Sequence, residues 1–374
     1  MTGRNAAVAA ESPRNSNTKE KSAIMTNEHD EQGIAARLSL QRLDMGYKLS
    51  QALYVVAKLG VADHLHSAGR SVDEVAEAVG AHRGALYRVL RTLASVGVFT
   101  EVEPQRFALT PMGECLRTDI PGSMRAQTIL TELVWESWGH MMHSVLTGET
   151  AFEHLRGMSV FEYLQRNPQE GRLFDAAMTG YVSQNSAAIV ETYDFSQFEK
   201  VVDVGGGHAA LMTEILKKNV EVRGIVYDRP DVIEGARANI DTQGLLERCE
   251  CIGGDFFESI PAGGDAYLLS SIIHDWDDER SLSILKNCRR VMRAEAKLLL
   301  VELVIPVGDE PSFGKLLDLE MLVNFGGQER TEDEFRALLQ ASGFTLSRII
   351  QTSASPCIIE AVPNSEMNFS PHGL

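Results

Sequence analysis

Cysteine is scarce in this chain, and its cysteines are never spaced as metal-binding or redox pairs. There are five, an odd number, and no Cys-x-x-Cys motif occurs. A disulfide scaffold needs a dense and even set of cysteines, and a structural zinc site needs close pairs. We therefore expect no disulfide framework, no metal, and a reducing compartment such as the cytoplasm.

Long apolar runs and an excess of positive charge are also missing. The formal net charge is −17, and no apolar stretch is long enough to span a bilayer or to serve as the core of a signal peptide. Nucleic acids and anionic membranes are bound through clustered Lys and Arg, so neither is an expected partner. The polar ends are expected to be a disordered tail (1–34) and a loose tail (364–374).

What the chain does contain is enough for two packed domains. It has 374 residues, of which 44 % are hydrophobic, and the pattern changes near residue 190. Residues 35–190 read as mostly helical. Over residues 191–363, short apolar runs alternate with helical periodicity, which predicts a parallel, doubly wound, Rossmann-like α/β sheet.

The first domain carries the layout of a winged helix. Ser71, followed three residues later by Glu74, forms a capping box that begins a short helix. A second helix over 81–96 and a small hairpin over 97–110 complete the layout. The second helix offers three arginines but acidic residues surround them, so the pattern favours dimerisation. A winged-helix transcriptional regulator remains the alternative.

Aromatic and methionine side chains are concentrated in the helical stretch 123–185. Residues of this kind at helical spacing most often form plain core or a dimer interface. They also line pockets for flat aromatic ligands. The pocket interpretation is favoured for Phe174, Met178 and Tyr181.

A glycine-rich turn organises the second domain. Val201–Gly207 reads as a buried strand that runs through an acid into three glycines, and a helical pattern follows. Glycines let the backbone approach a ligand closely, and the next helix start directs free N–H groups to the same place. Asp228 ends the next predicted strand, where an acid suits ribose hydroxyls. A plain turn is the alternative, and a nicotinamide dehydrogenase would use the same sheet.

Polar and aromatic side chains follow several of the predicted strands. Ligands of doubly wound sheets bind beyond the carboxyl ends of the strands, so we expect one crevice to gather these residues. They are Asp203 with Gly205, Asp228, Asp255 with Phe256, and Ser270 with His274.

His274 is the candidate base. It directly follows a buried strand, and the ordinary pKa of histidine suits proton transfer near neutral pH. Glu302, in an otherwise apolar strand, and Glu329, just before a helix, are candidates to orient the ring. The alternatives are a structural histidine at a helix start and ordinary salt bridges. Asp275 and Asp277 are interpreted as helix N-caps.

Five motifs carry a resemblance that covers about residues 35–363. They are Val-Asp-Val-Gly-Gly-Gly (202–207), Tyr-Asp-Arg-Pro (227–230), Gly-Gly-Asp-Phe-Phe (253–257), Ile-His-Asp-Trp-Asp-Asp-Glu (273–279) and Gly-Gly-Gln-Glu-Arg-Thr (326–331). As a set they resemble the S-adenosylmethionine-dependent O-methyltransferases. The branch is that of plant caffeate and flavonoid enzymes and bacterial enzymes of antibiotic biosynthesis.

The resemblance implies a cofactor, S-adenosylmethionine, and the residues that bind it. Gly205 would approach its methionine portion and Asp228 would hold its ribose. Ser270 stands where the plant enzymes usually have Lys, and Ala209 replaces the last glycine of the loop. The full set implied for the cofactor is Asp203, Gly205, Asp228, Asp255, Phe256 and Ser270, with Asp255 and Phe256 flanking the adenine.

The resemblance also implies a reaction. His274 matches the general base, with Glu302 and Glu329 as its orienting acids, and Met321 and Asn324 fall where the acceptor binds. The expected activity is methylation of a phenolic or enolic hydroxyl of an aromatic or polyketide-type secondary metabolite, by a homodimer. Some relatives keep the cofactor and catalyse hydroxylation or decarboxylation, which is the alternative within the family.

Overall fold

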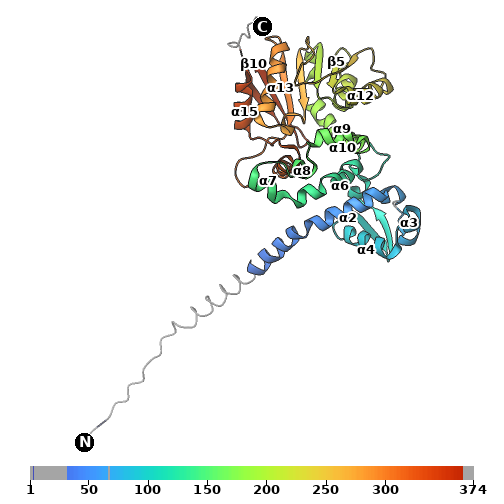
Figure 1. Cartoon of the computed structure of the whole chain (residues 1–374). Helices are drawn as coiled ribbons and strands as arrows, with labels where there is room; N and C mark the ends of the chain where they lie inside the picture. The colour runs from blue at the N-terminus through green and yellow to red at the C-terminus, as the bar shows by residue number, and fades with distance from the viewer. Residues whose placement is uncertain (1–2, 4–31, 66–67, 365–374) are drawn as a thin grey trace. The chain divides into compact units, whose positions relative to one another are not determined.

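The computed structural model describes residue 3 and residues 32–65 and 68–364. The two predicted tails fall outside this range, except that residues 32–34 are helical. The chain separates into two compact units, Met1–Val55 and Val56–Leu374. In the first, a helix over 32–44 is followed by a turn at Met45 and the start of α2 (Gly46–Leu59) (Figure 1).

The winged-helix layout predicted from the sequence is present in the second unit. Both halves of the capping box form, because Ser71 Oγ accepts from the Glu74 amide and the Glu74 carboxylate accepts from the Ser71 amide. A three-stranded antiparallel sheet of order β1-β3-β2 provides the wing. The elements are η1 (Val61–His64), β1 (Arg70–Ser71), α3 (Val72–Val79), α4 (Arg83–Ala94), β2 (Phe99–Glu103), β3 (Arg106–Leu109) and α5 (Pro111–Glu114).

A run of helices connects this module to the large sheet. Three of them begin at a side-chain cap or a proline, which fixes where the chain turns into each helix. The helices are α6 (Arg125–Gly139), α7 (Met141–Thr147), α8 (Ala151–Arg156), α9 (Val160–Arg166) and α10 (Pro168–Thr192).

The large sheet has seven strands in the order β6-β5-β4-β7-β8-β10-β9. All of the pairings from β6 to β8 are parallel, as predicted. The expectation of a wholly parallel sheet is wrong at one place, since β10 runs antiparallel to both β8 and β9. The strands are β4 (Lys200–Val204), β5 (Arg223–Asp228), β6 (Cys249–Gly253), β7 (Ala266–Ser270), β8 (Lys297–Glu302), β9 (Phe344–Ile350) and β10 (Cys357–Pro363).

Helices cover both faces of this sheet, which makes it doubly wound (Figure 1). One core packs α11 (Ala210–Lys218), α12 (Pro230–Thr242) and the end of α10 against the strands. The other packs α13 (Asp278–Val291) and α15 (Glu332–Ala341). Both cores consist of buried aliphatic and aromatic side chains, so burial of apolar surface holds the layers together.

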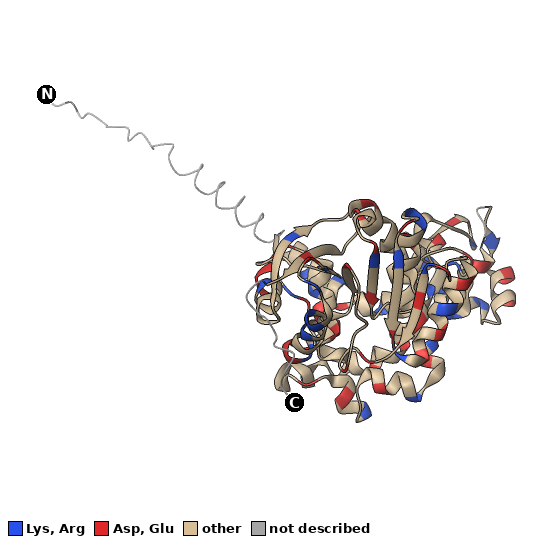
Figure 2. Cartoon of the chain, turned by 90° about the horizontal axis from the view of Figure 1, so that it is seen from above, with Lys and Arg blue, Asp and Glu red and all other residues tan. Residues whose placement is uncertain are grey.

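Three short elements lie in the connections around the strands of the sheet. They are η2 (Phe195–Gln197), which precedes β4, the turn η3 (Ile273–Asp275), which follows β7, and α14 (Phe313–Glu320), which continues as a π-helix, η4 (Met321–Phe325). Single-turn π-helices are frequent at functional sites. In the described part of the chain, no helix is long and apolar enough to cross a membrane. Lys and Arg are interspersed with Asp and Glu along the ribbon (Figure 2).

Candidate active site

The glycine-rich turn after β4 needs glycine for two different reasons. Gly205 has a φ of +74°, and a Cβ there would overlap the Cδ1 of Ile272. At Gly206 a Cβ would come within 2.8 Å of Asp203 Oδ2. The loop therefore packs directly against Ile272, two residues before His274.

Two acids meet this loop. The amides of Gly207 and Arg229 donate to the Asp228 carboxylate at 2.8 and 2.7 Å. Asp203 is 1 % exposed, and its Oδ1 has no hydrogen-bond partner among the described residues. Burial, reinforced by the charge of Asp228, raises the pKa of Asp203 to about 7. A buried carboxylate oxygen without a partner is costly while the group is charged, which is the reason that burial favours the protonated acid here.

The other residues expected around a cofactor lie at neighbouring strand ends. The Phe256 ring has an atom 3.7 Å from where a Gly205 Cβ would stand, and it packs edge-on against Phe257 and Trp276. The Asp255 carboxylate is exposed and accepts from the Phe257 amide at 2.8 Å. Ser270 is the half-buried last residue of β7.

His274 is buried between carboxylates. Its Nδ1 lies 2.7 Å from Glu329 Oε1 and 3.9 Å from Glu302 Oε2. The other oxygen of Glu302 accepts from the amides of Ile272 and Ile273 at 3.1 and 2.8 Å. The structure thus brings together the three predicted catalytic residues from β8, η3 and the segment before α15. With Nδ1 held, Nε2 is the nitrogen left for a reacting group.

The charges in this cluster shift one another. Burial lowers the pKa of His274, but Glu302, Asp275 and Glu329 together outweigh burial and raise it to about 10. Burial raises the pKa of Glu302 to about 7, against the opposing effect of His274. The cluster therefore shares protons rather than behaving as three independent groups.

The prediction that Asp275 is a helix N-cap is wrong. Asp277, not Asp275, caps α13, by accepting from the Arg280 amide at 2.8 Å. Asp275 lies in η3, where its Oδ1 is 3.5 Å from His274 Nε2. Burial raises the pKa of this carboxyl to about 6. The N-cap pattern Asp-x-Asp fits either residue, so only the turn geometry separates them.

Arg330 was missed altogether. It is 1 % exposed, and its guanidinium donates to the carbonyls of Ile273 and Trp276, each at 3.1 Å. It also donates to the Asp278 carboxylate at 2.8 Å. An arginine in a polar motif gives no sequence signal of burial, because arginine is almost never buried unless it is paired.

The residues expected on the acceptor side fall into two groups. Phe174 belongs to an aromatic cluster in which Phe161 stacks on Trp276, with ring centroids 5.2 Å apart, and contacts Phe325. Tyr181 is a half-buried residue of α10, and burial, followed by the charges of Glu329 and Glu302, raises its pKa to about 12.

The second group is more enclosed. Met321 and Asn324 lie on the π-helix and are 3 and 2 % exposed. The Asn324 amide is bonded within the protein, to Glu320 at 2.9 Å and to Ser137. Met178 is half-buried on α10.

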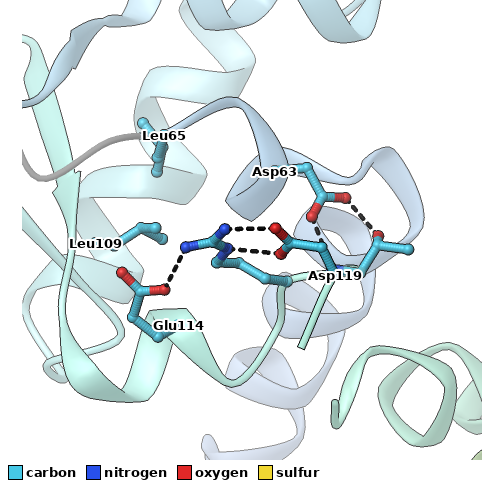
Figure 3. Close-up of a pocket in the computed structure, with 7 residues that line it drawn as sticks. Asp63, Leu65, Leu109, Glu114 and Asp119 are labelled. Carbon is cyan, nitrogen blue, oxygen red and sulfur yellow. Dashed lines mark hydrogen bonds and ion pairs between the residues drawn. The ribbon is translucent and has the colours of Figure 1, made fainter. Parts of the chain in front are cut away.

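A separate cavity of about 480 Å³ lies near the wing. Arg117 is among the residues that line it, and it pairs with Asp119 and Glu114, two acids labelled in Figure 3, at 2.6 and 3.0 Å. The cavity is lined by three carboxylates and one arginine, so its lining carries a net negative charge.

A Rossmann-like sheet with a glycine loop, an acid on the next strand and a buried imidazole beside the loop defines an S-adenosylmethionine-dependent methyltransferase. Residues 138–345 match the O-methyltransferase domain, and residues 42–119 match the O-methyltransferase dimerisation domain. The chain belongs to this O-methyltransferase family, and its cofactor is S-adenosylmethionine.

Curated relatives span nearly the whole chain. It is 49 % identical to the phenazine O-methyltransferase PhzM of Lysobacter antibioticus, over 87 % of this chain and 95 % of that protein. It is 34 % identical to the 8-amino-8-demethylriboflavin N,N-dimethyltransferase of Streptomyces davaonensis, over 85 and 92 %. The family resemblance found in the sequence is confirmed, and its relatives methylate both oxygen and nitrogen.

Solved structures match as closely. The crystal structure of LaPhzM aligns with a TM-score of 0.84 and 48 % identity, over 88 % of this chain and 99 % of that one. CalO1, a methyltransferase of calicheamicin biosynthesis in its SAH-bound form, aligns with a TM-score of 0.77 and 32 % identity, over 88 and 98 %.

Proposed function

We propose that this methyltransferase acts on a phenolic or enolic hydroxyl of a flat aromatic or polyketide-type secondary metabolite, with His274 as general base. The observation that carries this proposal is the buried imidazole held by Glu329 at 2.7 Å, on a turn whose Ile272 packs against the glycine loop. An imidazole beside the methyl donor site and fixed through one nitrogen can accept a proton at the other.

The residues around the loop fit the cofactor. The Gly205 backbone packs so closely on Ile272 that no Cβ would fit there, and the unpaired Asp203 Oδ1 would suit an ammonium group. Asp228 would take the ribose, Phe256 the adenine face, and Asp255 and Ser270 its edges. When bound, the cofactor supplies an electrophilic methyl group on a positively charged sulfur.

The carboxylates around His274 raise its pKa to about 10, so they favour the protonated ring, and the ring has to be deprotonated before it can act as a base. A free phenol has a pKa of about 10 as well, so proton exchange between phenol oxygen and Nε2 is nearly even. A positive charge bound next to the ring lowers the pKa of the ring further towards neutral. Glu329 and Glu302 then stabilise the imidazolium that forms.

Aromatic side chains supply the acceptor surface. Phe161, Phe174, Phe325 and Trp276 contact one another beside the catalytic turn. Such a surface favours a planar acceptor, since flat rings bury area without losing many rotamers. Met178, Tyr181, Met321 and Asn324 complete the proposed acceptor set. The relatives that methylate phenazine and riboflavin-type rings support a fused-ring acceptor.

Two further points belong to the proposal. The dimerisation domain supports a homodimer. An aromatic amine is a second candidate acceptor, because one relative is an N,N-dimethyltransferase.

The test is an acceptor panel. The protein is incubated with S-adenosylmethionine and matched hydroxy- and amino-substituted phenazines, naphthalenes and anthraquinones, and products are analysed by mass spectrometry. A gain of one methyl on the hydroxy members alone supports the proposal. Methylation of amines alone, or turnover only on single-ring phenols, would contradict it.

A further inference from the structure

The turn that carries His274 and the segment that carries Glu329 form one hydrogen-bonded unit. The Gln328 amide donates to the His274 carbonyl at 2.9 Å. Gly327 packs so closely on the same backbone that a Cβ there would overlap the His274 carbonyl oxygen. Only glycine allows this approach. The distance between His274 and Glu329 is therefore set by how these two backbone segments are joined.

Arg330 supplies the remaining bonds of the join. Its Nη1 donates to the carbonyl of Ile273 and its Nη2 to the carbonyl of Trp276, each at 3.1 Å. The carbonyls of residues 273, 274 and 276 are thus all bonded by residues 328–330. The planar guanidinium can reach two carbonyls at once, which a lysine cannot.

The anchor of Arg330 lies at the surface. Asp278 Oδ1 accepts from Arg330 Nη2 at 2.8 Å, from Arg330 Nε at 3.2 Å and from Gln328 Nε2 at 3.0 Å. The Asp278 side chain is 66 % exposed, whereas that of Arg330 is 1 % exposed. Asp278 is the carboxylate that pairs with this buried charge, and losing it would leave the guanidinium with backbone carbonyls and the Ser281 hydroxyl.

We propose that Asp278 and Arg330 are positioning residues, which hold Glu329 against His274 and so set the orientation of the base. Neither side chain touches the reacting atoms; both act through the backbone of the catalytic turn. The inference rests on the proposed role of His274.

Asp278→Asn is the main variant, because its exposed site should tolerate the change. Loss of the charge loosens Arg330 and Gln328, so the Glu329–His274 contact lengthens. We expect kcat to fall about tenfold, short of the roughly 10²-fold typical of a 1 Å displacement in an active site. The Kd for S-adenosylmethionine should stay unchanged. Glu279→Gln is the matched control, since it removes an adjacent exposed charge from the same helix turn.

A second readout does not depend on turnover. The ring ¹⁵N signals of His274, assigned by their absence in His274→Gln, are titrated with pH. A looser Glu329 contact should lower the pKa of His274 by about one unit in Asp278→Asn. In Asp278→Glu, which keeps the charge, kcat and the pKa of His274 should both fall less than in Asp278→Asn. In folded Arg330→Lys, both should fall more than in Asp278→Asn.

The outcomes separate the two proposals. Unchanged kcat and an unchanged His274 titration in Asp278→Asn would overturn the positioning role, as would equal effects in Glu279→Gln. A loss of kcat that only follows the folded fraction in urea unfolding would also overturn it. Wild-type turnover in His274→Gln would instead show that His274 is not the general base. The ¹⁵N titration would still report whether Asp278 acts on Glu329 through Arg330.

Discussion

Removing the imidazole should cost both catalysis and stability, and the two costs can be separated. In His274→Ala, proton transfer loses its base, so turnover should fall by roughly 10²–10⁴-fold. Glu302 is 1 % exposed and the Glu329 side chain 0 % exposed, so both carboxylates lose their buried partner. Leaving buried charge unpaired costs about 3–5 kcal/mol. That corresponds to a lowering of Tm by roughly 5–15 °C.

A second substitution distinguishes the two effects. In His274→Ala, Glu329→Gln, one orphaned charge is replaced by a neutral amide, so part of the lost stability should return while turnover stays low. Turnover is measured by mass spectrometry, stability by urea unfolding, and cofactor binding by calorimetry, with Glu329→Gln as the single-variant control. Near wild-type turnover in His274→Ala would refute the argument. So would a recovery of turnover in the double variant.

Three other outcomes are expected. Glu302→Gln keeps an oxygen for the amides of Ile272 and Ile273 but removes a charge that raises the pKa of His274. The pKa of His274 should therefore fall. The acid limb of the pH–rate profile, where protonated His274 is inactive, should move to lower pH. Dialysis against EDTA should leave turnover unchanged, since His274 Nδ1 and Glu329 Oε1 are 2.7 Å apart, which is a hydrogen-bond distance; loss of activity restored by a divalent ion would contradict this. Ala209→Gly should stabilise the fold by about 1 kcal/mol in urea unfolding, because Ala209 has a φ of +64° and glycine removes that strain; an unchanged midpoint would show that the strain is compensated elsewhere.

Local patterns predicted the parts of the fold that neighbouring residues decide. The capping box at Ser71 forms as expected, because it needs only residues three apart. Glu302 is buried beside His274, as an acid in an apolar strand suggested. These patterns lie within short stretches of sequence, so they can be recognised before the tertiary structure is known.

Tertiary contacts decided the rest. β10 reads as an ordinary strand, and its direction depends on which strands it joins. Asp275 and Asp277 are equivalent as caps until the turn is built. Arg330 is polar in sequence and buried in the fold, because partners from 49 to 57 residues away satisfy it. No local pattern encodes such distant pairing.

The placement of β10 has a consequence for how the protein is made. It is the last strand of the sheet in chain order, yet it lies between β8 and β9 rather than at an edge. During synthesis, the edges of β8 and β9 that pair with β10 stay unpaired until residues 357–363 have left the ribosome. A nascent chain stalled before residue 357 should therefore bind chaperones. It should also be cleaved by proteases that do not cleave the finished sheet.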